Sequence, residues 1–358
     1  MENWSFEKFI EGDFPIYGSG GLIGYHNQKT STAPNIVIGR SGSTGKLYYI
    51  EKDFWAHNTG IFISDKKNNF CKYLFYLLSI VDMEELSTKT AVPTLDRKKI
   101  QEYKLPYTTN IDEQQRIANF LDDKCACIDS VIEKTRASID EYKKLKQAVI
   151  TRAVTKGIRP NRTMKDSGIE WIGDIPADWN TCRLRFLCDI LTGNQDTQDN
   201  KPNGEYPFYV RSPVVERCEK WTFDGAAILM SGDGAGAGRI FHYVDGKYGC
   251  HQRVYSLQNI KQINRRFLFY YLKELFYVSI ETANSKSTVD SVRLSMLQNF
   301  PILITSKEEQ QEIVNYLDEK TAQIDSVIAK KNQLVSELES LKKSLIFEYV
   351  TGKKELPT

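Results

Sequence analysis

The sequence is poor in the patterns that signal catalysis or metal binding. Its seven cysteines form no Cys-x-x-Cys pair, and its four histidines stand at no spacing typical of metal ligands. It has no nucleophile elbow, no helicase signature and no Asn/Asp-Pro-Pro-aromatic motif of the kind that accompanies amino methylation. No catalytic constellation and no metal or cofactor motif is therefore visible, and we expect the cysteines to be reduced packing or surface residues.

Long hydrophobic runs are absent as well. No apolar run reaches the roughly 18 residues that suggest a membrane-spanning helix, and no signal peptide opens the chain. We expect a cytoplasmic protein with no membrane partner. The 358 residues are 41% hydrophobic and 26% charged, which is ordinary for a globular protein and enough for two or three domains.

A strong net charge is also missing. The formal charge of +2 is too small to indicate nucleic acid binding by itself. Locally, however, the segment from Lys143 to Lys165 carries eight basic residues and no acidic one. This segment could lie along a phosphate backbone, or it could be the solvated end of a helix beside a linker, and the sequence leaves both interpretations open.

What the chain does contain is an internal repeat. The stretch from Glu113 to Lys134 returns as Glu309 to Lys330 at a constant offset of 196 residues, with 15 of 22 positions identical and no gap. Chance does not produce such a match, so we expect two related halves and a pseudo-twofold arrangement.

Each copy predicts one long helix with an apolar seam, because apolar residues recur at alternating steps of four and three. In the first copy the seam comprises Ile117, Leu121, Lys124, Ile128, Val131, Thr135, Ser138, Tyr142, Leu145 and Val149. In the second copy it comprises Ile313, Leu317, Lys320, Ile324, Val327, Lys331, Leu334, Leu338, Leu341 and Leu345. The two helices should pack on each other within one chain, although the periodicity alone would also suit a coiled coil between two chains.

Capping signals mark both helix starts. Asn110 is followed by Glu113, and Ser306 by Glu309, which predicts a capping box at each start. Neither proline nor glycine interrupts the following run of about 45 residues, which would form a rod of roughly 65–70 Å.

A small α/β body is expected before each helix. In residues 14–108 we predict strands at 35–39, 46–50 and 60–63 and a short buried helix at 73–81. Residues 206–304 repeat this plan. The matching segments are Tyr206–Tyr209 with Phe14–Tyr17, Ala227–Gly238 with Asn35–Gly45, Phe267–Leu272 with Tyr73–Leu78, and Phe300-Pro301 with Leu105-Pro106. Between the first helix and the second body we expect a linker over 157–166 and an ordered, docked loop over 167–179.

Two glycine-rich stretches occupy the same place in the repeat. Residues 39–46 faintly suggest a phosphate-binding P-loop, but Leu47 stands where Ser or Thr should bind magnesium. Residues 232–238 suggest a dinucleotide loop without its βαβ context. We interpret both as tight turns between strands that let the backbone approach a ligand. Each ends in a basic residue, Lys46 or Arg239, which suits contact with phosphates or base edges, and a plain hairpin turn is the alternative.

Polar side chains of the types that bind DNA recur at corresponding places in both bodies. Arg, Asn, Gln, Lys, Ser and Thr hydrogen-bond base edges and phosphates. Each alone would be an ordinary surface residue, but their recurrence makes the group a candidate DNA-binding set. The set comprises Arg40, Ser41, Ser43, Thr44, Lys46, His57, Asn58, Lys89, Thr90, Arg211, Ser231, Asp233, Arg239, His251, Arg253, Lys286, Ser287 and Thr288.

Several of these motifs resemble one known family, the specificity subunits of type I restriction–modification systems. The resemblance rests on the two Glu-Gln-Gln-x-Ile-x-x-Phe/Tyr-Leu-Asp helix starts, on Lys165 to Pro176, and on the ending Val350 to Lys353, and it spans nearly the whole chain. It implies an α+β protein with two target-recognition domains separated by a long antiparallel coiled-coil helix pair. The domains would be residues 1–109 and 158–305, and the helices 110–157 and 306–358.

The resemblance also implies a function. Each domain would bind one half of a bipartite double-stranded DNA site, and the helix pair would set the spacer and dock two methyltransferase subunits. Restriction subunits would join them, and this subunit would be non-catalytic.

The chain departs from the family pattern at its N-terminus. The second body is preceded by a lead-in of some 35 residues that the first body lacks, which predicts weaker or altered recognition by the first domain. A recombined or truncated specificity cassette, a silent cassette that only donates domains, a standalone DNA-binding coiled-coil protein, and a nuclease or methyltransferase in its own right are the alternatives.

Overall fold

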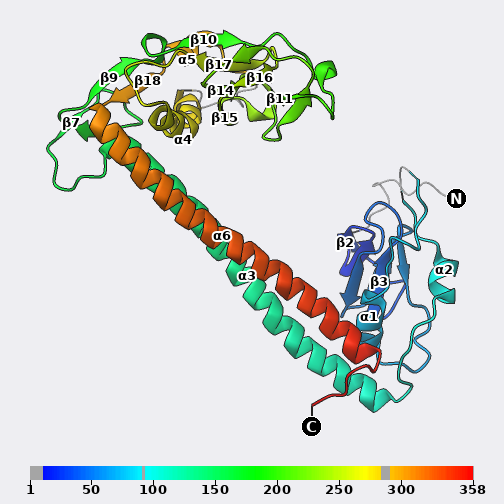
Figure 1. The fold of residues 1–358 in the computed structure, drawn as a ribbon. Helices are drawn as coiled ribbons and strands as arrows, with labels where there is room; N and C mark the ends of the chain where they lie inside the picture. The colour runs from blue at the N-terminus through cyan, green and yellow to red at the C-terminus, as the bar shows by residue number, and fades with distance from the viewer. Residues whose placement is uncertain (1–10, 91–92, 284–290, 358) are drawn as a thin grey trace. The chain divides into compact units, whose positions relative to one another are not determined.

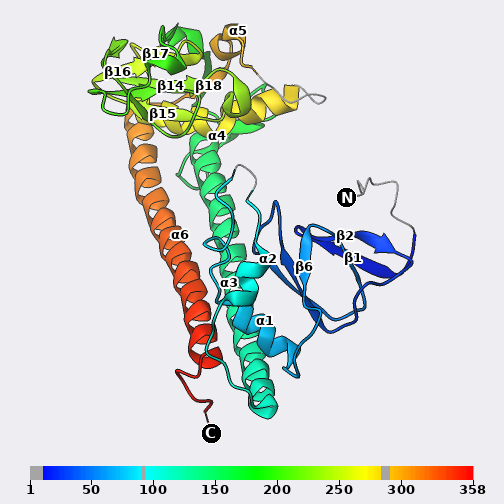
Figure 2. The ribbon, with the colours of Figure 1, turned by 90° about the vertical axis from the view of Figure 1, so that its right-hand side faces the viewer.

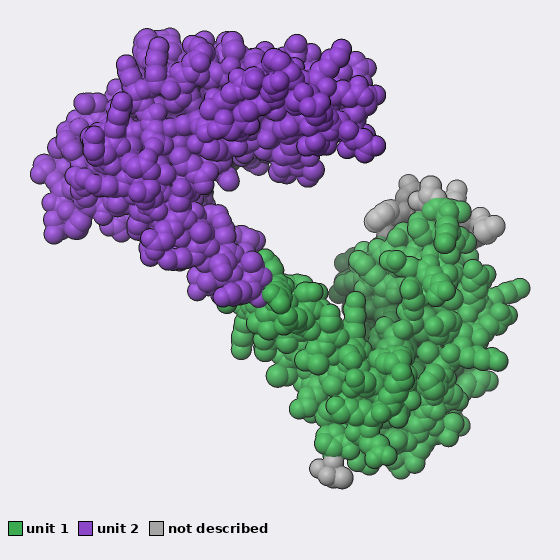
Figure 3. Space-filling model, viewed as in Figure 1, with its two compact units in different colours: residues 1–137, 331–358 green, residues 138–330 purple. Residues whose placement is uncertain are grey.

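The computed structural model describes residues 11–90, 93–283 and 291–357. The chain divides into two compact units, shown in Figure 3: unit 1 comprises residues 1–137 and 331–358, and unit 2 comprises residues 138–330. Each unit contains one mixed α/β body and one part of each long helix (Figure 1). None of the described helices is long and apolar enough to cross a membrane.

Unit 1 contains two small sheets and two short helices. One sheet has the order β2-β1-β5 and the other the order β4-β3-β6, while α1 packs against β3 and β4. The elements are β1 (Phe14–Gly18), β2 (Gly21–His26), β3 (Asn35–Gly39), β4 (Leu47–Ile50), β5 (Trp55–Ala56), β6 (Gly60–Phe62), α1 (Cys71–Ser79) and α2 (Arg97–Glu102). The three strands and the short helix predicted from the sequence are therefore confirmed, to within two residues at each end.

Unit 2 repeats this plan with additional strands. Its two four-stranded sheets have the orders β12-β11-β16-β13 and β10-β17-β14-β15, and α4 packs against β14 and β15 (Figure 2). The strands are β10 (Asp189–Thr192), β11 (Tyr206–Tyr209), β12 (Glu216–Cys218), β13 (Phe223–Asp224), β14 (Ala227–Ser231), β15 (Phe241–Val244), β16 (Lys247–Cys250) and β17 (Val254–Gln258). The helical elements are η2 (Leu184–Phe186), η3 (Thr197–Asp199), η4 (Gly234–Gly236), α4 (Arg265–Ala283) and α5 (Leu294–Gln298).

The predicted correspondence between the two bodies is confirmed by strand pairing. β1 pairs in parallel with β5, as β11 pairs in parallel with β16. β3 lies between β4 and β6, as β14 lies between β15 and β17. The two bodies are thus built on one topology, even though their sequences have diverged.

The loop expected to dock before the second body does so. β7 (Met164–Asp166) pairs with β8 (Asp174–Pro176), and Trp179 is fully buried in the core of unit 2. β9 (Asn180–Arg183) then pairs with β18 (Pro301–Ile304), and β10 pairs with β17. Among the described residues of unit 1, no strand takes the places of β9 and β10.

The two long helices are α3 (Ile111–Lys156) and α6 (Lys307–Val350). The Asn110 side chain accepts hydrogen bonds from the backbone N–H groups of Asp112 and Glu113, at 3.0 and 3.2 Å, so the predicted cap is confirmed. The reciprocal bond of a capping box is not formed, because the Asn110 N–H donates to the Thr108 hydroxyl and the Glu113 carboxylate accepts from that hydroxyl as well.

Equivalent ion pairs join the two helices in each unit. Within unit 1, Lys342 Nζ lies 2.6 Å from Asp129 Oδ2. Within unit 2, Lys146 Nζ lies 2.6 Å from Asp325 Oδ2. The 196-residue offset relates the two aspartates to each other and the two lysines to each other, so the helix-to-helix contacts follow the internal repeat. In unit 1 the pairs Asp129–Lys342 and Arg136–Glu339 run in opposite directions along the two helices, which makes that contact antiparallel.

The predicted apolar seam is only half right. Leu121 and Leu317 are buried as expected, whereas Leu145 and Leu341 are 49% and 53% exposed. The positions buried instead of the predicted ones lie one residue further along, and they include Cys125, Ile132, Ile139, Thr321 and Val335. An alternation of four and three steps can start in either phase, and the sequence pattern does not say which. The same phase shift occurs in both helices.

The repeated motif at the helix starts has a structural cause. The buried Gln114 amide oxygen accepts the N–H of Phe70 at the start of α1, at 2.7 Å. Gln310 accepts the N–H of Asn264 at the start of α4 in the same way, at 2.6 Å. An unpaired buried amide is costly, and in both copies the buried Gln at this position has its hydrogen-bond partner. The motif therefore joins each body to its long helix.

A second repeated contact lies about two turns further along each helix. The Tyr76 hydroxyl donates to Asp122 at 2.6 Å, and the Tyr270 hydroxyl donates to Asp318 at 2.5 Å. The two aspartates belong to the identical Leu-Asp pair of the repeat. All seven cysteines are free, as expected.

Candidate nucleic-acid interface

The glycine-rich stretches are tight turns between strands, as predicted. The first joins β3 to β4, and Gly42 and Gly45 adopt φ angles of 81° and 79° that favour glycine. The second joins β14 to β15 through η4, with Gly234 and Gly238 at 71° and 67°. The backbone N–H of Gly39 donates to Lys46 across the first turn, at 2.8 Å.

A histidine turn stands beside each glycine-rich turn. The His57 N–H donates to Tyr17 O on the paired strand at 2.9 Å, and the His251 N–H donates to Tyr209 O at 3.1 Å. Each imidazole Nδ1 then accepts the backbone N–H two residues on, from Thr59 at 3.3 Å or from Arg253 at 3.0 Å. Burial lowers the pKa of His57, which keeps its Nδ1 neutral and able to accept.

The two turns touch each other in the same way in both units. The Arg40 N–H donates to Thr59 O at 2.8 Å, and the Gly232 N–H donates to Arg253 O at 2.9 Å. Thus each unit presents one composite surface, made of a glycine-rich turn and a histidine turn that are joined by equivalent backbone hydrogen bonds.

In unit 2 this surface contains a hollow of about 620 Å³. It brings four of the predicted residues together, namely Arg211, Asp233, Arg239 and His251. Arg211 NH1 lies 3.2 Å from Asp233 Oδ1, and Arg253 Nε lies 3.7 Å from Asp233 Oδ2. The carboxylate is therefore flanked by two guanidinium groups that remain substantially exposed.

Other predicted residues of unit 2 are occupied within the fold. The Arg239 guanidinium lies 3.7 Å from the centre of the Tyr277 ring and donates to its hydroxyl. Ser231 is buried, and its hydroxyl donates to Asp233 O, so it supports the turn. Lys286, Ser287 and Thr288 lie outside the described residues.

Two residues near this hollow were not predicted. Asp196 Oδ1 lies 3.4 Å from the buried His251 Nε2, and Thr197 lines the hollow. Hydrogen bonds from the Thr197 N–H and hydroxyl, together with His251, lower the pKa of Asp196. Both residues belong to the stretch before β11 that has no counterpart in the first body, so the repeat could not reveal them.

In unit 1 the predicted residues are spread over neighbouring loops. Arg40 lines a hollow of about 1020 Å³ beside β6 and α2. Arg40 and Lys46 are exposed, and among the described residues neither has an ion-pair partner. Ser41 bridges to Thr94, the Thr44 hydroxyl donates to Pro93 O, and Ser43 is half-buried. Asn58, Lys89 and Thr90 are exposed on adjacent loops.

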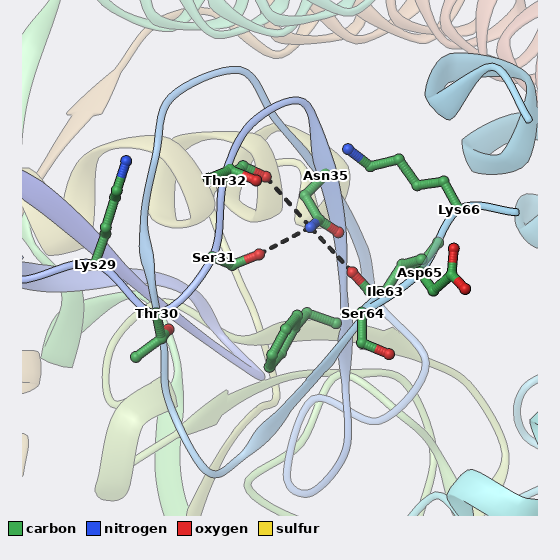
Figure 4. Close-up of a pocket in the computed structure, with 10 residues that line it drawn as sticks. Lys29, Thr30, Ser31, Thr32, Asn35, Ile63, Ser64, Asp65 and Lys66 are labelled. Atoms are coloured by element: carbon green, nitrogen blue, oxygen red, sulfur yellow. Dashed lines mark hydrogen bonds between the residues drawn. The ribbon is translucent and has the colours of Figure 1, made fainter. Parts of the chain in front are cut away.

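A different hollow of unit 1 is structural in character. Figure 4 shows it between the 29–32 and 63–66 segments. Its volume is about 530 Å³. The Asn35 amide donates to the Ser31 hydroxyl and to the carbonyls of Thr32 and Ile63 (Figure 4). Lys29 at its rim pairs with Asp53 at 2.6 Å. The polar groups of this hollow are thus largely used inside the fold.

The basic segment 143–165 is mostly neutralised within unit 2. Its paired cations are Lys143 with Asp140, Lys144 with Glu141, Lys146 with Asp325, Arg159 with Glu312, and Arg162 with Glu309 and Asp178. This pairing favours the interpretation of a solvated helix end and linker over that of a phosphate-binding run.

No group of three or more metal-ligating side chains occurs within residues 11–90, 93–283 and 291–357. The arrangement in both units is instead one of exposed donors and acceptors on rigid turns, which suits recognition of a polar surface.

Comparisons with known proteins agree with this architecture. A family model described as "Type I restriction modification DNA specificity domain" matches residues 5–140 and 176–336. The chain is 28% identical over 180 residues to the type I restriction enzyme EcoDI specificity subunit of Escherichia coli, covering 50% of this chain and 39% of that relative. It is 24% identical over 307 residues to the MjaVIII specificity subunit of Methanocaldococcus jannaschii, covering 78% and 69%.

A solved structure has the same fold. It comes from a work described as "Structural basis underlying complex assembly and conformational transition of the type I R-M system". The TM-score is 0.73 at 16% identity, and the match covers 95% of this chain and 92% of that chain.

Proposed function

Because the chain belongs to the type I restriction modification DNA specificity family, we propose that it is the non-catalytic subunit that selects a bipartite DNA site. Each unit would bind one half-site in double-stranded DNA. Two methyltransferase subunits would dock on α3 and α6 and supply the chemistry, and restriction subunits would complete the assembly.

The repetition of the composite surface carries this proposal. Both units present a glycine-rich turn and a histidine turn on the same hydrogen-bonded backbone, with different side chains at equivalent positions. We expect a shared backbone arrangement with different exposed side chains in a protein whose two units bind two different sequences of the same kind of polymer. Exposed Arg, Lys, Asn and Ser side chains are of the types that contact phosphates and base edges.

The helices support the second part of the proposal. α3 and α6 have 46 and 44 residues without an internal break. A continuous helix transmits a fixed length of about 1.5 Å per residue, whereas a flexible linker would not. We expect this length to set the number of unread base pairs between the half-sites.

Sequencing of methylated sites tests the proposal. DNA from cells that produce this chain with its methyltransferase should carry methyladenine at two short defined half-sites with a constant spacer. Cells with the methyltransferase alone are the control and should lack this pattern. Methylation at a single uninterrupted site, or at no defined site, would contradict the proposal.

A further inference from the structure

Three equivalent positions around the composite surface differ in chemical character between the two units. In unit 1 they carry small hydroxyl side chains, and in unit 2 they carry charged ones: Ser19, Ser41 and Thr59 correspond to Arg211, Asp233 and Arg253.

Backbone contacts establish this correspondence. The carbonyls of Thr59 and Arg253 accept equivalent hydrogen bonds from the glycine-rich turns. Ser41 and Asp233 form equivalent bridges, to Thr94 and Ser291. The remaining pair, Ser19 and Arg211, stands two residues after the equivalent strand residues Tyr17 and Tyr209.

In unit 1 two of the three residues are engaged with each other. The Thr59 hydroxyl accepts the backbone N–H of Ser19 at 3.2 Å and lies 2.8 Å from His57 Nδ1. In unit 2 the charged side chains extend from the same backbone instead. The side chains of Arg211, Asp233 and Arg253 are 45%, 22% and 65% exposed.

A carboxylate is an unexpected group on a surface that binds DNA, because it repels phosphates. Asp233 is nevertheless placed between two arginines, at 3.2 Å from Arg211 and 3.7 Å from Arg253. The three side chains together carry one net positive charge and present donors on both sides of an acceptor. An acceptor is needed where the DNA itself offers a hydrogen-bond donor.

We propose that Arg211, Asp233 and Arg253 read one G·C base pair in the major groove of the half-site bound by unit 2. This inference rests on the proposed function. Guanine presents the acceptors N7 and O6, which an arginine contacts in bidentate fashion, and cytosine presents the N4 donor, which an aspartate accepts. Along the edge of a G·C pair the two guanine acceptors are followed by the cytosine donor, so one arginine on guanine and Asp233 on cytosine complement the pair. The second arginine holds the carboxylate from its other side.

Unit 1 has no charged group at these positions, so its half-site is read by other means. The triad thus accounts for a difference in specificity between two units that share one backbone framework.

Asp233→Ser tests the proposal, because Ser is the side chain that unit 1 carries at this position. Methylated sites are sequenced for complexes containing the wild-type chain, Asp233→Ser, Ser41→Ala and Asp245→Asn. The last variant removes a carboxylate that also pairs with an arginine, Arg265, at 3.0 Å but lies outside the hollow.

Asp233→Ser should relax one G·C position in one half-site by about 10-fold to 100-fold in discrimination. Ser41→Ala should leave that half-site unchanged, and Asp245→Asn should leave both unchanged. Binding to a panel of duplexes with each base at that position, measured on the purified complex, gives the same discrimination independently of methylation.

Three results would overturn the inference. The first is an Asp233→Ser variant that loses base discrimination equally at both half-sites. The second is an Asp233→Ser variant whose affinity changes by the same factor for all duplexes, which would mean that Asp233 only positions the arginines. The third is a relaxed position that is not a G·C pair. A wild-type complex with no bipartite preference would instead refute the proposed function, and the inference with it.

Discussion

At the scale of single residues, Glu309 shows how the two copies of the repeat have been put to different uses. Glu309 is 2% exposed and accepts hydrogen bonds from Arg162, Trp179 and Thr305. Its counterpart Glu113 is exposed and accepts from the Thr108 hydroxyl. The glutamate at this position of the repeat therefore joins the segment before β11 to α6 in unit 2, whereas its counterpart in unit 1 lies at the surface.

Glu309→Gln should destabilise unit 2 by about 3 kcal/mol, because it removes one partner of a buried ion pair while Arg162 keeps Asp178. The matched variant Glu113→Gln should change the stability of unit 1 by less than about 0.5 kcal/mol. Hydrogen exchange, resolved for the strands of each unit, measures both effects. Equal protection in the two variants would show that the Glu309 cluster contributes nothing to unit 2.

The same cluster sets a pH dependence. Burial alone would raise the pKa of Glu309, but the hydrogen bonds from Arg162, Thr305 and Trp179 outweigh it and lower the pKa below its ordinary value of 4.5. The fold thus favours the ionised form, so the stabilisation is complete above pH 4.5 and is lost as the pH falls through the lower folded value. In Glu309→Gln, this part of the acid sensitivity should disappear.

The residues that could be predicted from the sequence are those that the repeat marks twice. His57 with His251 and the two glycine-rich turns were found in this way, and their backbone frameworks agree. Asp196 was not, because it belongs to a stretch with no counterpart. The triad around Asp233 could not be assembled from the sequence either, since its members come from three separate loops.

At the scale of elements, the long helices were predictable and the phase of their seam was not. Caps, the absence of breakers and the apolar period define where α3 and α6 lie. Which of two adjacent positions faces the partner helix depends on tertiary packing, which the apolar period alone does not encode. As a result, some apolar residues assigned to the seam face outward.

Two of these outward residues occupy the same position of the repeat. Leu145 and Leu341 are related by the 196-residue offset and are both about half exposed. A single exposed leucine is ordinary, but a repeated one is what two identical partner subunits would require. We expect Leu145→Asp and Leu341→Asp each to remove one docked methyltransferase subunit, and the double variant to remove both.

Leu334 provides the control for this prediction. It is also exposed on α6, but the equivalent residue in the first copy is Ser138. Leu334→Asp should leave the stoichiometry of the complex, measured by light scattering of the purified assembly, unchanged. If the Leu145/Leu341 double variant still bound two methyltransferase subunits, docking would have to be assigned to other residues.

At the scale of the whole molecule, we propose that one chain binds two half-sites and sets the number of base pairs between them. The internal repeat predicted the two bodies and their shared topology, because the strand and helix signals recur in the same order. The additional strands β9 and β10 of unit 2 follow from sequence that is present in one half only. We expect the spacer length to depend on the length of the continuous helices.

The most direct test lengthens both helices. One heptad inserted in α3 after Ala137 and one in α6 after Lys330, at the division between the two units, keeps the period of the seam and adds about 10 Å to each helix. Sequencing of methylated sites should then show the two wild-type half-sites separated by a spacer about three base pairs longer, since base pairs rise by about 3.4 Å. An active complex with the original spacer would contradict the claim that the helix pair sets the distance between the half-sites.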